Sequence, residues 1–241
     1  MNLLANILTN LSLFCGFISI ILSLERHFTF AAWAIIISVI FDGIDGQIAR
    51  RNPIPSAFGK ELDSLVDVVA FGIAPSVLGY VFIYDHFHVI AALFLFSYLL
   101  CSVLRLAKYN ITAKEELANC FIGLPTTASG GILASFLLIY RRKEDMFIPP
   151  FLPDILSPQF MPITFLLLVL ILSFLMVSRV RYLNLDGLKK ILGKHIKLTV
   201  PIFLILLILA GLTQKFGIGL FTLFLIYLIF SPFVVKRLNG S

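Results

Sequence analysis

Long apolar stretches recur along the whole chain, and they limit its possible folds more than any other feature. Hydrophobic residues make up 59% of the 241 residues and charged residues only 13%, which excludes a soluble globular domain. A helix needs about 20 apolar residues to cross a bilayer core about 30 Å thick. The sequence therefore predicts an all-α integral membrane protein with about eight transmembrane helices. The predicted spans are residues 4–24, 28–49, 62–83, 88–109, 121–140, 161–178, 197–213 and 216–234.

The chain is predicted to form one membrane domain, because neither a repeat nor a long linker divides residues 1–241. The core of this domain, with the candidate catalytic residues, is expected over about residues 1–178. Residues 180–196 are basic and carry leucine and isoleucine at helical spacing, which predicts an amphipathic helix on the cytoplasmic membrane surface. Residues 197–234 are predicted to form a C-terminal helical hairpin.

The basic residues are distributed unevenly between the two sides of the predicted membrane. Most of the 19 Lys and Arg residues fall on one side when successive loops are assigned to alternate sides. By the positive-inside rule, both termini and the loop 50–61 are predicted to be cytoplasmic in the cell membrane. This bias and contacts with the lipid bilayer account for the net charge of +6, so we expect no nucleic-acid partner.

Four aspartates lie near the predicted cytoplasmic ends of the second and third spans: Asp42, Asp45, Asp63 and Asp67. A charged side chain at membrane depth costs about 2.5–3.5 kcal/mol on insertion scales, so such residues are candidates for a functional site. Helical periodicity places Asp42 and Asp45 on one face and Asp63 and Asp67 on another. The two helices are joined by a short loop, so the faces can meet. Carboxylates gathered in this way favour two hard divalent cations, Mg²⁺ or Mn²⁺.

The residues that follow the first aspartates suit a phosphate-bearing ligand. Gly46 and Ala49 lie on the same helical face as Asp42 and Asp45 and leave room for a ligand near the backbone. The guanidinium of Arg50 can bind a phosphate or pyrophosphate through paired hydrogen bonds. Two other interpretations of the aspartates remain, a structural salt-bridge cluster and the ion pathway of a divalent-cation transporter.

The same residues match the signature D-x2-D-G-x2-A-R-x8-G-x3-D-x3-D, and in this the chain resembles the CDP-alcohol phosphotransferase family. The matching residues are Asp42, Asp45, Gly46, Ala49, Arg50, Gly59, Asp63 and Asp67. The resemblance implies that the four aspartates ligate metal and that Asp67 is also the general base. The residues implied to form the CDP site are Gly46, Ala49, Arg50, Gly59, Asn6 and Thr9.

Residues 61–75 and 104–110 are similar to the phosphatidylserine synthase branch of that family. This resemblance implies transfer of a phosphatidyl group from CDP-diacylglycerol, or from its archaeal counterpart CDP-archaeol, to the hydroxyl of L-serine, with release of CMP. It also implies a homodimer. Arg105, Lys108 and Asn110 are then candidates for binding serine or lipid phosphate, although a charged helix end favoured by the helix dipole is the alternative. Glycerol phosphate and inositol phosphate are the alternative acceptors.

Overall fold

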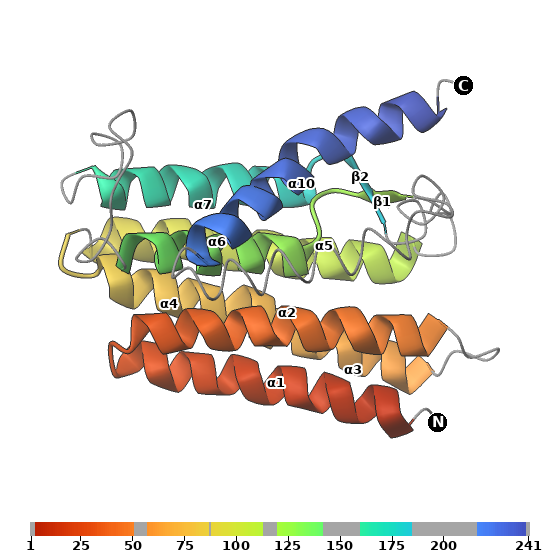
Figure 1. The fold of residues 1–241 in the computed structure, drawn as a ribbon, viewed down its shortest axis with the longest axis horizontal. Coiled ribbons are helices and arrows are strands. Elements are labelled where there is room, and N and C mark those ends of the chain that lie inside the picture. The colour runs from red at the N-terminus through yellow and green to blue at the C-terminus, as the bar shows by residue number, and fades with distance from the viewer. Residues whose placement is uncertain are drawn as a thin grey trace.

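The computed structural model describes residues 3–50, 57–86, 88–112, 120–141, 160–184 and 216–239. This part of the chain forms a bundle of long helices with a small two-stranded ribbon (Figure 1). The helices are α1 (Leu3–Leu24), α2 (Phe28–Arg50), α3 (Ala57–Asp67), the π-helix η1 (Val68–Ile73), α4 (Ala74–Ile83), α5 (His88–Thr112), α6 (Thr126–Arg141), α7 (Met161–Val177) and α10 (Phe216–Asn239). The strands are β1 (Cys120–Ile122) and β2 (Arg181–Leu183), which pair antiparallel.

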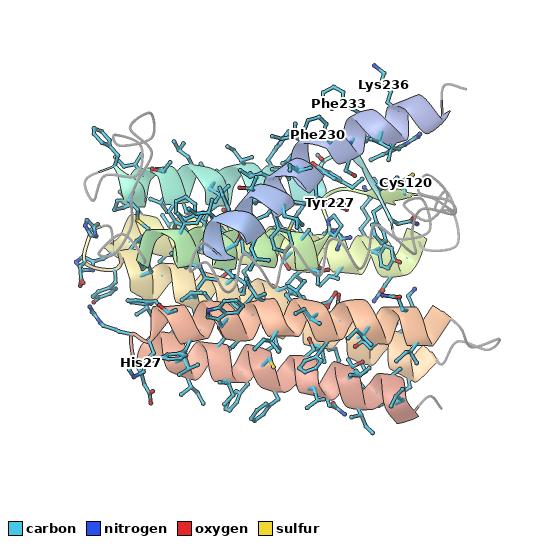
Figure 2. All side chains as sticks on the ribbon, in the orientation of Figure 1. His27, Cys120, Tyr227, Phe230, Phe233 and Lys236 are labelled. Atoms are coloured by element: carbon cyan, nitrogen blue, oxygen red, sulfur yellow. The ribbon has the colours of Figure 1, made fainter. Side chains whose placement is uncertain are left out.

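Five of the described helical stretches are long and apolar enough to cross a membrane. They lie in α1, α2, the continuous path α3–η1–α4, α5 and α10, whereas α6 and α7 are apolar but shorter. Phe230 and Phe233 of α10 point away from the bundle (Figure 2) and are 58% and 69% exposed, as expected for side chains in lipid. The prediction of an all-α, multi-pass membrane protein is therefore confirmed. The predicted span 197–213 lies outside the described residues, so the number of eight spans stays a prediction.

The predicted span 121–140 is wrong at its start, because α6 begins only at Thr126. Gly123 has a φ of +79°, a conformation that glycine adopts far more readily than other residues. Its amide donates a hydrogen bond to the Val180 carbonyl at 2.8 Å, which ties this turn to the ribbon. Pro125 adds a second break, since the residue before a proline disfavours the helical conformation. The apolar composition of the segment hid a strand and a turn.

The predicted amphipathic helix 180–196 is wrong over its first residues. Residues 181–183 form the strand β2, in which Tyr182 pairs with Phe121 of β1. Tyr182 is only 1% exposed, so burial and strand pairing override the helical spacing here. Residues 185–196 lie outside the described part of the chain, and their predicted helix stays a prediction.

The predicted span 62–83 is one continuous helical path, but it is not a uniform α-helix. The π-helix η1 begins directly after Asp67. Pro75 lies in the first turn of α4 and has no N–H, so the Phe71 carbonyl cannot receive the usual hydrogen bond from four residues further on. Short π segments inside α-helices are often found at functional sites.

Small residues allow close helix contacts around the middle of the bundle, as in other membrane proteins. A Cβ on Gly16 of α1 would lie 2.8 Å from the Cα of Ala70 in η1, and Gly131 of α6 faces the Phe224 ring of α10. In this arrangement the end of α2, the start of α3, the end of α5 and the ribbon lie at the same end of the bundle as both termini (Figure 1).

Candidate active site

Asp42 of α2 meets Asp63 and Asp67 of α3 between two antiparallel helices. One carboxylate oxygen from each of the three lies within 4.8 Å of the others, and all three side chains are half-buried. The spacing of four residues places Asp63 and Asp67 on one face of α3, and this face is directed toward the end of α2. The structure thus brings together three of the four aspartates whose helical spacing predicted that they meet.

These carboxylates are too close together to stay ionised without a positive partner. Asp67 and Asp42 are within hydrogen-bonding reach of each other, and Asp63 also repels Asp67. Oδ1 of Asp67 is buried and has no hydrogen-bond partner in the described part of the chain, although buried polar atoms nearly always have one. A set of carboxylate oxygens with one left unsatisfied fits a hard divalent cation such as Mg²⁺ or Mn²⁺.

Asp45 lies beside this group of three. It is 3% exposed, and the Thr9 hydroxyl of α1 donates a hydrogen bond to its Oδ2 at 2.8 Å. The charges of Asp42 and Asp63 act on it, so the four carboxylates form one electrostatic cluster. The resemblance implied that Thr9 contacts CDP. In the structure its hydroxyl contacts Asp45 and orients that carboxylate.

The other residues implied to bind CDP lie on the three helices that carry the cluster. Asn6 of α1, Gly46 of α2 and Gly59 of α3 are half-buried. Ala49 and Arg50 end α2, and their side chains are outside the described part of the structure. Contact of these five residues with CDP stays a prediction.

Arg105 of α5 approaches the cluster from another helix. It is 9% exposed, and its charge acts on Asp67. Its Nη1 donates a hydrogen bond to the Thr126 hydroxyl of α6 at 3.2 Å, and the guanidinium lies over the Tyr109 ring at 5.9 Å from the centroid. A guanidinium held in this way next to a carboxylate cluster can bind an anionic group of a ligand.

A small pocket opens beside Arg105. It is lined by Leu104, Arg105, Lys108, Tyr109, Ile122, Met176, Val177 and Ser178. These residues belong to α5, to β1 and to the C-terminal end of α7. Several distant segments therefore build this pocket, and two of its lining residues, Arg105 and Lys108, are predicted site residues.

Asn110, the third predicted residue on α5, connects this helix to α3. Its Nδ2 donates a hydrogen bond to the Ser64 hydroxyl at 2.9 Å. Its backbone carbonyl accepts one from Lys60 at 3.1 Å. Asn110 therefore has a structural role next to the cluster, and its contact with serine or lipid phosphate stays a prediction. Lys108 is exposed and lines the pocket.

The sequence did not single out the residues of α10 that hold β2, the strand paired with β1. The Tyr227 hydroxyl donates a hydrogen bond to the Leu183 carbonyl of β2 at 3.0 Å, and Ser231 accepts one from the Leu183 amide. The available signal was the spacing of four residues between Tyr227 and Ser231 on a mostly apolar helix, which places both on one face.

The chain is similar to known proteins over most of its length. Residues 2–170 match the model of the CDP-alcohol phosphatidyltransferase family. The chain is 31% identical to a CDP-diacylglycerol–serine O-phosphatidyltransferase of Helicobacter pylori, over 95% of this chain and 89% of that protein. It is 31% identical to the protein of that name from Bacillus subtilis, over 76% of this chain and 90% of that one. It is 32% identical to archaetidylserine synthase of Methanothermobacter thermautotrophicus, over 76% and 71% of the two chains. The chain therefore belongs to the CDP-alcohol phosphatidyltransferase family.

Proposed function

We propose that this protein transfers the phosphatidyl group of CDP-diacylglycerol or CDP-archaeol to the hydroxyl of L-serine and releases CMP. The observation that carries this proposal is the group of Asp42, Asp63 and Asp67 within helices long enough to span a membrane, with the Arg105 charge acting on it. Family membership supports the CDP-alcohol chemistry. Relatives named for serine and archaetidylserine support serine as the acceptor.

The proposed metal ligands are Asp42, Asp45, Asp63 and Asp67, which would hold two Mg²⁺ or Mn²⁺ ions. When bound, these ions would neutralise the pyrophosphate and stabilise the charge that develops on the leaving CMP. Thr9 would keep the Asp45 carboxylate in place through its hydrogen bond, as groups behind metal ligands commonly do.

Asp67 is the proposed general base. Its carboxylate would accept the proton of the serine hydroxyl while the serine oxygen attacks the lipid-side phosphorus of the CDP-lipid. A new P–O bond then joins serine to the phosphatidyl group. The P–O bond to CMP breaks, CMP leaves with the electron pair, and Asp67 later releases the proton to water.

The pocket beside Arg105 is the proposed serine site. A carboxylate can bind a guanidinium through two parallel hydrogen bonds, and the apolar side chains of Ile122 and Met176 limit the acceptor to a small one. Glycerol phosphate or inositol phosphate would bring an additional phosphate. Such acceptors would need more positive charge than Arg105 and Lys108, the cations that line this pocket.

A site at one end of the bundle suits substrates that come from two phases. The lipid chains can stay in the bilayer while CDP and serine remain in contact with water. We propose that this end faces the cytoplasm at the cell membrane, in accordance with the distribution of basic residues. A homodimer is the expected assembly.

The test of the function is CMP release by the purified protein, given CDP-diacylglycerol and Mn²⁺, with and without L-serine. We expect CMP release that depends on serine, together with a new aminophospholipid. Release that depends on glycerol phosphate or inositol phosphate would change the acceptor and keep the chemistry. If no acceptor yields CMP, the enzyme proposal is wrong, and divalent-cation transport by the same carboxylates becomes the better explanation.

Replacing Arg105 with alanine should raise the KM for serine by about 10- to 100-fold. The reason is that a hydrogen bond to a charged group contributes about 1.5–3 kcal/mol and each 1.4 kcal/mol is about tenfold. The KM for CDP-diacylglycerol should change much less, and Arg105→Lys should recover part of the loss. Steady-state kinetics with each substrate varied in turn measures both values.

The matched control for this prediction is Arg26→Ala. Arg26 pairs with Asp85 at 3.1 Å. It precedes His27, which lies at the opposite end of the bundle from Cys120 in Figure 2. Both KM values should stay as in the unmodified protein. If Arg105→Ala raises the KM for CDP-diacylglycerol more than that for serine, Arg105 binds the lipid phosphate instead.

A further inference from the structure

The hydroxyl of Tyr98 in α5 links three helices behind the aspartate cluster. It donates a hydrogen bond to the Phe71 carbonyl of η1 at 3.0 Å and accepts one from the Ser129 hydroxyl of α6 at 2.8 Å. Tyr98 and Ser129 are both 0% exposed. A buried chain of hydrogen bonds therefore runs from α6 through α5 to the π-helix that begins after Asp67.

Pro75 removes the α-helical donor to the Phe71 carbonyl, which receives a hydrogen bond from another helix. In an α-helix this carbonyl would accept a hydrogen bond from the backbone nitrogen of residue 75, but proline has no hydrogen there. Water is absent from the apolar core of a membrane, so a backbone group freed by proline must find a partner within the protein. The Tyr98 hydroxyl donates to the Phe71 carbonyl from α5 and provides such a partner.

The π-helix also determines the direction in which the α3 carboxylates point. A π turn contains one more residue than an α turn, and each residue of an α-helix rotates the chain by about 100°. If η1 became α-helical, Asp63 and Asp67 would rotate by about that angle relative to α4. The α4 helix cannot follow freely, because a Cβ on its Gly79 would lie 2.7 Å from the Phe165 ring of α7.

We propose that Tyr98, oriented by Ser129, is a positioning residue that maintains η1 and thereby keeps Asp67 facing Asp42. The inference rests on the proposed function, in which Asp67 binds metal and acts as the base. It assigns Tyr98 an effect on metal affinity and turnover as well as on stability. A hydrogen bond that only satisfies the Phe71 carbonyl would affect the stability of the fold and leave both other properties unchanged.

The test is Tyr98→Phe, which removes the hydroxyl and keeps the ring. Mn²⁺ binding to the purified protein is measured in the presence of CMP by electron paramagnetic resonance of the free ion, and kcat is measured by CMP release. Substitution of a group that supports a metal ligand typically lowers metal affinity or activity by about 10- to 100-fold. We therefore expect the Kd for Mn²⁺ to rise and kcat to fall by about tenfold each. Tyr80→Phe, at a residue whose ring packs edge-on against Tyr84, is the matched control and should behave like the unmodified protein.

Ser129→Ala provides a second, milder variant. It removes the donor to Tyr98 and should produce a smaller change in both quantities in the same direction. The double variant with Tyr98→Phe should be no worse than Tyr98→Phe alone, because both act through one chain of hydrogen bonds. If Tyr98→Phe does not fold, an unchanged Mn²⁺ affinity and kcat in Ser129→Ala overturns the inference.

Failure of this inference can be separated from failure of the proposed function by including Asp67→Asn. Mn²⁺ binding that is weakened by Asp67→Asn but not by a folded Tyr98→Phe protein would overturn the positioning role alone. Absence of Mn²⁺ binding by the unmodified protein would overturn the metal site and this inference with it.

Discussion

Asp67→Asn should lower serine-dependent CMP release by about 10²- to 10⁴-fold, the range that general-base catalysis contributes. The amide has nearly the same shape as the carboxylate but cannot accept the proton of the attacking hydroxyl. Asp42 and Asp63 remain in place, so binding of CDP-diacylglycerol should stay measurable. The turnover number and a direct binding titration of the CDP-lipid, made on the same protein preparation, separate the two effects.

The control for this prediction is the same chemical change at Asp85. This residue is exposed, lies between α4 and α5, and pairs with Arg26 at 3.1 Å. Asp85→Asn removes a carboxylate charge away from the cluster and should leave turnover unchanged. Near-normal turnover in Asp67→Asn would show that Asp67 is not the base.

Asp45→Ala should weaken Mn²⁺-dependent binding of CMP by about tenfold or more, a loss within the range seen when the surroundings of a metal site are altered. Asp45 is buried and lies within electrostatic reach of Asp42 and Asp63, so its removal takes a negative charge from the proposed two-ion site. Titration of CMP binding with and without Mn²⁺ measures the metal-dependent part directly.

Thr9→Val is the informative companion to Asp45→Ala. Valine keeps the volume of threonine but cannot donate the 2.8 Å hydrogen bond to the Asp45 carboxylate. We expect a smaller loss of Mn²⁺-dependent binding than in Asp45→Ala. An unchanged titration in Asp45→Ala would contradict the two-ion model and would leave Asp42, Asp63 and Asp67 as the ligands of a single ion.

The aspartate group was the most predictable part of the site. Asp63 and Asp67 are four residues apart, and the helix that carries Asp42 ends only a few residues before theirs begins. Helical periodicity and a short connection together leave few ways to arrange such helices. The meeting of these three carboxylates therefore followed from local features of the chain.

The two-stranded ribbon could not be predicted in the same way. Cys120 pairs with Leu183, and no local pattern relates two apolar segments so far apart in the chain. In a sequence this rich in hydrophobic residues, a three-residue strand looks like the beginning of a helix. Gly123 and Pro125 were the only local indications of a turn, and both were outweighed by the apolar residues around them.

Long apolar stretches and one spaced signature were thus enough to indicate the membrane class, the family resemblance and the candidate catalytic residues, because each depends on residues near one another in the chain. Tertiary structure decided the rest: Thr9 orients Asp45, the Arg105 charge acts on Asp67, and the Tyr98 hydroxyl donates a hydrogen bond to the Phe71 carbonyl of η1. Each of these contacts joins separate helices. Each therefore depends on how far the helices rotate about their axes, which close packing and the π turn determine and local sequence does not.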